Sequence, residues 1–233
     1  FLVFVAHLLL RHAQADIALA DLDGNIDGGN GDKRDGQRHQ QVDQHRPQRA
    51  CGGVRIIGGE WKCSKLPLPR NVDLRPTPDR VRETLFNWLG QDLTGWHCVD
   101  AFAGTGALGF EAASRGAAHV LLCDANALCI EAMAKSQAKL GANQLRMVRG
   151  DGLSTLRQQA PQSVDLVFLD PPYDFPQYPM ALAAAAACIK PSGQIYLEAA
   201  KAWRDDDVSA WGLRVAKHLK AGAVHAHLLQ PAA

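Results

Sequence analysis

The sequence predicts an α/β fold in which a parallel sheet is covered by helices on both faces. Between residues 97 and 199, short continuous apolar runs alternate with helical segments, as in parallel strands that are buried on both faces. A glycine-rich loop joins the first of these strands to a helix. The 233 residues are 47% hydrophobic with a net charge of +1, which allows one domain with an appendage and excludes a polybasic tail protein.

The first 53 residues differ from the rest of the chain. They hold seven Asp and no Glu, and residues 21–53 show no apolar period of either 2 or 3.6 residues, so they cannot bury a face. We therefore expect residues 1–53 to be a disordered extension or the product of a mis-annotated gene start. An export signal is a third interpretation, because residues 1–15 contain an apolar run followed by a small-x-small site.

Residues 54–95 are expected to form a small basic module of one hairpin and one helix. Apolar and polar residues alternate around a turn at Gly58-Gly59. A helix then begins with Thr77 as N-cap and Pro78 at its first position, and Gly90 ends it. Its apolar face comprises Val81, Leu85, Trp88 and Leu89.

Residues 96–233 are expected to form the main domain. The predicted strands are 97–102, 119–124, 145–150, 164–170 and 193–199, with helices at 107–115, 126–140, 152–159 and 177–190. Near the end of the chain, two alternating stretches meet at Lys220-Ala221-Gly222, which predicts a final antiparallel hairpin.

The glycine-rich loop within residues 99–117 indicates a nucleotide-containing ligand. Gly104, Gly106 and Gly109 match the dinucleotide-binding spacing G-x-G-x-x-G. Asp100 stands just before the loop, where its carboxylate would repel a pyrophosphate but suit the positively charged end of S-adenosylmethionine. We therefore favour S-adenosylmethionine over NAD, and a glycine turn needed only for packing stays as the alternative.

Two further acidic residues follow the next two strands. Asp124 lies 18 residues after Gly106, a place where a carboxylate accepts hydrogen bonds from ribose hydroxyls in both NAD and S-adenosylmethionine sites. Asp151 could accept from an adenine amine, or it could be the N-cap of the helix that begins near Gly152. Both interpretations of Asp151 stay open.

The run "LDPPYD" at 169–174 is the most specific chemical signal in the chain. An exocyclic amine is a poor nucleophile because its lone pair is delocalised into the ring, so an enzyme must accept its hydrogens and position the nitrogen. The Asp170 carboxylate and the Pro171 carbonyl are such acceptors, Pro172 rigidifies the turn, and Tyr173 offers a face for stacking a base. The pattern indicates methylation of an exocyclic amine.

Basic residues gather ahead of the predicted sheet. Residues 55–82 carry seven basic and three acidic residues, whereas residues 83–233 carry a net charge of −2. A basic hairpin and helix start interleaved with Trp61 is typical of a nucleic-acid footprint, although a solvated face has the same composition. The candidate RNA contacts are Arg55, Lys62, Lys65, Arg75, Arg80 and Arg82. No metal site is expected, and we interpret His218, His225 and His227 as surface or packing residues.

Together these residues resemble the RsmD family of bacterial 16S rRNA guanine-N2 methyltransferases, from about Val54 to the end of the chain. The resemblance rests on "RIIGG", "LRPTPDRVRETLFNWL", "DAFAGTGALGFEAASRGA" and "DPPY" in that order. It implies a Rossmann-like class I S-adenosylmethionine-dependent methyltransferase with a seven-stranded sheet, order 3-2-1-4-5-7-6, in which the last strand is antiparallel. The family often has a second acidic residue where this chain has Asn126, and residues 1–53 have no family counterpart.

The resemblance also implies roles for individual residues. The cofactor site would comprise Asp100, Phe102, Gly104, Gly106, Asp124, Asp151 and Thr77, with Asp124 at the ribose and Asp151 at the adenine. Asp170, Pro171, Pro172 and Tyr173 would hold the target base. Arg75, Thr77, Asp79 and Arg82 match the motif that lies beside the mouth of the site.

The resulting hypothesis is a cytoplasmic, monomeric enzyme that methylates the N2 amine of a guanine in 16S rRNA of the small ribosomal subunit and has no membrane partner. Two enzymes that use the same D-P-P-Y logic stay as alternatives: an adenine-N6 DNA methyltransferase and a protein glutamine methyltransferase. A non-catalytic nucleotide-binding module is the alternative from another class.

Overall fold

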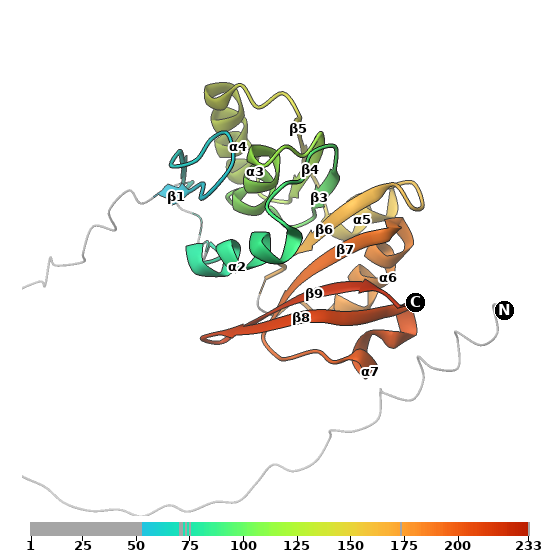
Figure 1. Cartoon of the computed structure of the whole chain (residues 1–233). Helices are drawn as coiled ribbons and strands as arrows, with labels where there is room; N and C mark the ends of the chain where they lie inside the picture. The colour runs from blue at the N-terminus through green and yellow to red at the C-terminus, as the bar shows by residue number, and fades with distance from the viewer. Residues whose placement is uncertain (1–52, 70–71, 73, 75, 173, 233) are drawn as a thin grey trace, which may run out of the picture. The chain divides into compact units, whose positions relative to one another are not determined.

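The computed structural model describes residues 53–69, 72, 74, 76–172 and 174–232. The expectation for residues 1–53 falls almost wholly outside this range, as do the predictions for Arg75 and Tyr173. Within it lie a two-stranded sheet, β1 (Gly53–Arg55) with β2 (Lys65–Pro67), and a seven-stranded sheet (Figure 1). Among the helices in this range, none combines the length and apolar character that a membrane crossing requires.

The seven-stranded sheet has the predicted topology. Its strands are β3 (His97–Asp100), β4 (His119–Asp124), β5 (Leu145–Arg149), β6 (Val164–Leu169), β7 (Ile189–Ala199), β8 (Leu213–Ala221) and β9 (Val224–Pro231). They lie in the order β5-β4-β3-β6-β7-β9-β8, which is 3-2-1-4-5-7-6 when they are numbered along the chain. β9 pairs antiparallel with both β7 and β8, so it runs opposite to the other six strands of this sheet. The predicted order and the antiparallel last strand are confirmed.

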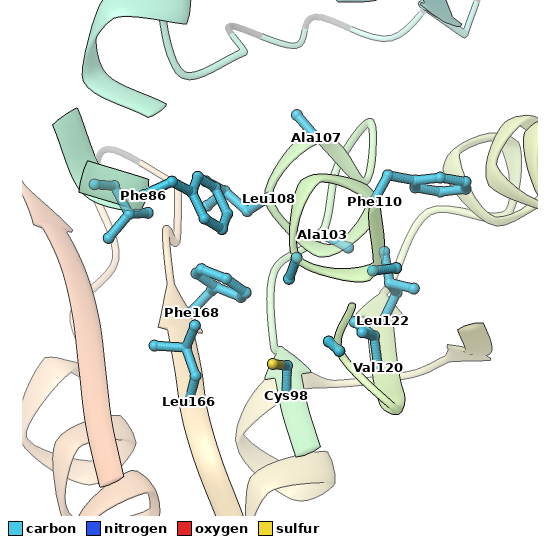
Figure 2. Close-up of a cluster of buried hydrophobic side chains, with 14 of the residues drawn as sticks. Phe86, Cys98, Ala103, Ala107, Leu108, Phe110, Val120, Leu122, Leu166 and Phe168 are labelled. Carbon is cyan, nitrogen blue, oxygen red and sulfur yellow. The ribbon is translucent and has the colours of Figure 1, made fainter. Parts of the chain in front are cut away.

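Helices cover both faces of this sheet because alternate strand residues point to opposite sides. The helices are α2 (Asp79–Leu89), α3 (Ala107–Ser114), α4 (Ala127–Leu140), α5 (Gly152–Arg157), α6 (Tyr178–Cys188), the short α7 (Asp205–Val208) and a 3-10 turn at Ser209–Trp211. Cys98 of β3 belongs to the core under α2, α3 and α4, and its neighbour Val99 to the core under α5 and α6. Figure 2 shows Phe86, Leu108 and Phe168 meeting in the first of these cores.

The start of α2 differs from the prediction. Asp79 is the first helical residue, Pro78 holds the cap position, and no side chain caps the helix. Thr77 is therefore not the N-cap. Its hydroxyl instead donates a hydrogen bond to Asp170, which follows β6. The end is as predicted: Gly90 adopts the left-handed conformation (φ 93°) that closes a helix.

A buried carboxylate holds the hairpin to the sheet. Glu111 of α3 is fully buried and accepts hydrogen bonds from the backbone N–H groups of Ile57 (2.7 Å) and Gly58 (2.8 Å). It also pairs with Arg115 at 2.7 Å and with Arg82 at 3.5 Å. These contacts join three segments that are distant in sequence, and they fix the hairpin against α3.

Candidate active site

A cavity of about 660 Å³ opens at the carboxyl ends of the parallel strands. This edge is where ligands bind in open α/β sheets. Thr77, ahead of the sheet, and Ala221 and Val224, in the last hairpin, complete its walls. Among the described residues that line the cavity no side chain is basic, and five are acidic: Asp100, Asp124, Asp151, Asp170 and Glu198. The cavity therefore suits a ligand with positive charge or hydrogen-bond donors better than one with phosphates.

Asp100 ends β3 and reaches under the glycine-rich loop. Its side chain is 1% exposed, and its Oδ2 accepts a hydrogen bond from the N–H of Gly109 at 3.1 Å. Its Oδ1 is buried and has no hydrogen-bond partner among the described residues. Burial raises the pKa of Asp100 to about 7, because a carboxylate without water or a cation is costly. An unpaired buried acceptor beside a cavity is what a cationic ligand would satisfy.

The loop itself is held by Asp124. The Oδ2 of Asp124 accepts from the N–H of Gly104 (2.7 Å), and its Oδ1 accepts from the N–H of Asn126 (2.8 Å). Gly106 has φ +78°, and a Cβ there would lie 2.8 Å from Phe110, so glycine is required on both conformational and steric grounds. Asn126, where the family often has an acid, caps α4 by accepting from the N–H of Leu128.

Asp151 is the N-cap of α5, as one of the two open interpretations predicted. Its Oδ2 accepts from the N–H of Ser154 at 2.8 Å, and hydrogen bonds from Ser154 lower the pKa of Asp151. The residue also lines the cavity, so a contact with an adenine amine stays a prediction. Gly152 packs so tightly that a Cβ would lie 2.2 Å from the carbonyl oxygen of Ala101.

Asp170 follows β6 and faces the same cavity. The Thr77 hydroxyl donates to its Oδ2 at 3.0 Å, so the residue expected beside the mouth of the site does reach it. Pro171 is buried and Pro172 is exposed, and both line the cavity. Phe102 also lines it, at 5.1 Å from the ring of Phe175 in an edge-to-face arrangement.

Sequence reasoning missed Glu198. This residue lies near the end of β7, is 6% exposed and lines the cavity. The hydroxyl of Tyr196 donates to its Oε1 at 2.7 Å. Burial, together with the charge of Glu198, raises the pKa of Asp170 well above its ordinary value, and burial likewise raises the pKa of Glu198. Its place at the carboxyl end of an expected parallel strand was the signal that could have found it.

Phe175 and Tyr178 were also missed. Both line the cavity, and their rings lie 5.4 Å apart in an edge-to-face arrangement. They follow the D-P-P-Y run but belong to no motif, so only the fold brings them to the site.

The candidate RNA contacts divide into two groups. Arg55, Lys62, Lys65 and Arg80 are exposed, although Arg55 also pairs with Asp79 at 3.1 Å. Arg82 is 0% exposed, so the expectation that it contacts RNA is wrong. Its guanidinium is bound by Glu111, by Asp79 and by the backbone carbonyls of Thr77 and Arg55. Arg82 therefore has a packing role inside the molecule.

The three tail histidines lie together on the final hairpin. His218 Nε2 and His225 Nδ1 are 2.9 Å apart, and the ring of His227 stacks on that of His218. His227 is buried and accepts from the N–H of Trp203, and burial lowers its pKa to about 4. Within the described part of the chain, no group of three or more His, Cys, Asp or Glu residues is arranged to hold a metal ion.

Comparison with known proteins places this geometry in context. Residues 54–230 match the model of a protein family described as conserved hypothetical protein 95. The chain is similar to ribosomal RNA small subunit methyltransferase D of Escherichia coli K12, with 46% identity over 122 residues that cover 52% of this chain and 61% of that protein. It is also similar to the protein of the same name from Haemophilus influenzae, with 40% identity over 157 residues, 65% of this chain and 81% of the relative.

Solved structures resemble the described fold. The structure of the Escherichia coli protein yhhF superposes with a TM-score of 0.69 at 36% identity, covering 78% of this chain and 99% of that one. The structure of Trm5b from Pyrococcus abyssi, at 17% identity and a TM-score of 0.59, covers 72% of this chain and 53% of that one and shares the fold alone.

Proposed function

Because the chain belongs to the RsmD family, described as conserved hypothetical protein 95, and has the class I methyltransferase fold, we propose that it is an S-adenosylmethionine-dependent rRNA methyltransferase. The proposed acceptor is the exocyclic N2 amine of a guanine in 16S rRNA of the small ribosomal subunit. The observation that carries the proposal is one acid-lined cavity, in which the glycine-rich loop after β3 faces Asp170 and Pro171 after β6. We expect the enzyme to act in the cytoplasm as a monomer.

The residues at the β3 end of the cavity fit S-adenosylmethionine, which supplies the methyl group when it is bound. The unpaired Oδ1 of Asp100 would accept from the ammonium of the methionine part, and that contact would replace the solvation that the buried carboxylate lacks. Asp124 would accept from the ribose hydroxyls and Asp151 from the adenine amine. A pyrophosphate, as in NAD, would face five carboxylates and, among the described lining residues, no cation.

The residues at the β6 end fit an exocyclic amine. The Asp170 carboxylate and the Pro171 carbonyl would accept its two N–H groups and so draw electron density toward the nitrogen. The prolines rigidify this turn, which matters because holding the amine in line with the methyl donor is most of the catalysis. Tyr173 is proposed to stack on the target base. No strong base is required, since the methylated ammonium loses its proton readily.

The exposed basic residues of the N-terminal module are proposed to contact the RNA backbone. Lys62, Lys65 and Arg80 are free to do so, together with Arg55 and, by prediction, Arg75. The target base must leave its stack to enter the cavity, at a cost of a few kcal/mol, and stacking on an aromatic ring worth about 1–3 kcal/mol offsets part of that cost.

The test is mass mapping of 16S rRNA from a strain that lacks this gene, complemented with the full chain or with variants. The unaltered chain should add one methyl group to one guanine. Asp170→Ala should abolish the modification and leave the affinity for S-adenosylmethionine, measured by calorimetry, nearly unchanged. Asp206→Ala, at an exposed position on α7 away from the cavity, is the matched control and should behave as the unaltered chain.

Other outcomes identify the alternatives. Methylation of adenine in deproteinised DNA, or of a protein glutamine, with no change in 16S rRNA would replace the proposed substrate. Failure to bind S-adenosylmethionine would favour the non-catalytic binding module. Turnover that survives Asp170→Ala would contradict the assignment of the acceptor site.

A further inference from the structure

Two carboxyl groups, not one, stand at the acceptor end of the cavity. Strands β6 and β7 are parallel neighbours in which Leu169 pairs with Leu197. Asp170 directly follows β6, and Glu198 is the next residue of β7, so the two stand side by side where neighbouring chains are about 4.8 Å apart. Both line the cavity. Of these two carboxyls, the D-P-P-Y run supplies only Asp170. Glu198 therefore has no role in the amine methylation described above.

Two hydroxyl groups of the protein hold the carboxyl pair in place. Thr77 donates to Oδ2 of Asp170 at 3.0 Å, and Tyr196 donates to Oε1 of Glu198 at 2.7 Å. Tyr196 is fully buried, so its hydroxyl holds Glu198 in one orientation. Among the described residues, Thr77 and Tyr196 are the side chains that donate to this pair, and Thr77 acts on Glu198 as well. Because a carboxylate can accept about four hydrogen bonds, each member of the pair can still accept from a ligand in the cavity.

The electrostatics of the pair favour a ligand with two adjacent donors. Burial raises the pKa of both Asp170 and Glu198, and the charge of Glu198 raises that of Asp170 further, so the doubly ionised pair is disfavoured. Hydrogen-bond donors placed against both carboxyls would stabilise the ionised forms. On its pairing edge, guanine presents a ring N1–H beside its N2 amine, whereas adenine presents an N1 acceptor beside its N6 amine.

We propose that Glu198 is a second acceptor-site residue, which accepts the N1–H of the target guanine while Asp170 accepts from the N2 amine. The pair thereby selects guanine over adenine, and Tyr196 is a positioning residue for Glu198. The inference rests on the proposed function, and it adds the residue that reads the identity of the base.

The test compares Glu198→Gln with the unaltered chain on small subunits from the strain that lacks this gene. With its amide oxygen held by Tyr196, Gln turns its NH₂ group toward the base, so two donors face each other. We expect kcat/KM to fall at least tenfold, with unchanged affinity for S-adenosylmethionine. Small subunits that carry adenine at the mapped position serve as the second substrate. The ratio of kcat/KM for guanine to kcat/KM for adenine should be at least tenfold smaller in Glu198→Gln than in the unaltered chain.

A pH profile separates base reading from a purely structural role. The ionised carboxylate of Asp170 accepts from the amine more strongly than the neutral acid does, so activity falls on the acid side as Asp170 takes up a proton. Removing the charge of Glu198 lowers the pKa of Asp170, so the acid limb of the kcat profile in Glu198→Gln should move to lower pH. Glu198→Asp keeps the charge on a shorter arm, so it should lose kcat/KM without that movement.

The controls keep this inference separate from the proposed function. Glu131→Gln, at an exposed position on α4, should match the unaltered chain in every assay. If the unaltered chain methylates a guanine and Glu198→Gln keeps both its kcat/KM and its acid limb, the inference is overturned and the proposed function stands. If the unaltered chain leaves small subunits unmethylated, both are overturned.

Discussion

Substitution of Glu111 is the most direct test of how the small basic module (residues 54–95) is held against α3. In Glu111→Ala, the backbone N–H groups of Ile57 and Gly58 lose their acceptor. Arg115 loses its ion-pair partner at 2.7 Å and keeps Gln91, and Arg82 keeps only Asp79 and two carbonyls. The substitution should therefore destabilise the whole domain and, above all, release the hairpin.

The expected magnitude follows from the burial of the network. Removing one member of a buried ion pair costs about 3–5 kcal/mol, and each buried N–H left without an acceptor adds about 1–3 kcal/mol. Ile57 and Gly58 are both half-buried, so water can replace the lost acceptor at both N–H groups, and they add little to the cost of the broken ion pair. We expect about 4 kcal/mol in the free energy of unfolding, and for a domain of this size about 2–4 °C per kcal/mol gives a Tm lower by roughly 8–16 °C.

The assay is urea and thermal unfolding followed by circular dichroism, with hydrogen exchange to locate the change. The matched control is Glu131→Ala, which removes an equally short but exposed pair with Lys135 (2.7 Å) and should cost about 0.3–0.5 kcal/mol. Amides of residues 53–67 should lose protection in Glu111→Ala and keep it in the control. A loss of stability in Glu111→Ala within about 1 kcal/mol of that in the control would refute the reasoning, since it would leave no energetic role for the buried network.

Three further predictions concern the cavity and the basic module. Gly152→Ala should destabilise the fold by about 1–3 kcal/mol in urea unfolding, because its Cβ would meet the carbonyl of Ala101. In the control Gly150→Ala, the nearest atom to the new Cβ lies 3.9 Å away. An equal loss of stability in the control would contradict the steric argument. Affinity for S-adenosylmethionine should fall as the pH drops below about 7, the pKa of Asp100, because an ammonium binds the ionised carboxylate. In calorimetry, Asp100→Asn should bind weakly and without this pH dependence. A variant that keeps the pH dependence of the unaltered chain would count against the contact. Lys65→Glu should weaken binding to small subunits, more so at low salt, and equal binding at all salt concentrations would remove Lys65 from the interface.

Local signals explain why most of the fold was predictable. The strand at 119–124 matches β4, because its apolar run is bounded on both sides. The strand expected at 193–199 begins four residues earlier, at Ile189, since Ile189 pairs with Val164 before an irregularity in the register. The proline and glycine within residues 191–193 are typical of a turn, so the sequence did not predict this extension.

The errors at the site have a different physical origin. Arg82 looked like an RNA contact because a count of charges does not reveal partners, and its partner Glu111 lies 29 residues further along on an otherwise apolar helix. Glu198 was missed because its strand-end position was the only local signal, and its place beside Asp170 depends on the register between β6 and β7. Motifs report residues that are close in sequence, whereas these pairs exist only after the sheet forms.

The hydrogen bond between Thr77 and Asp170 spans 93 positions of the chain, and this distance orders events during synthesis. A chain that has left the ribosome as far as α5 contains the glycine-rich loop, Asp124 and Asp151, but it lacks Asp170, Glu198 and the hairpin tip at Ala221 and Val224. Contacts of such sequence separation form late in folding. The β6 end of the cavity is therefore completed only when nearly the whole protein has been made, so a nascent chain offers any ligand an incomplete cavity.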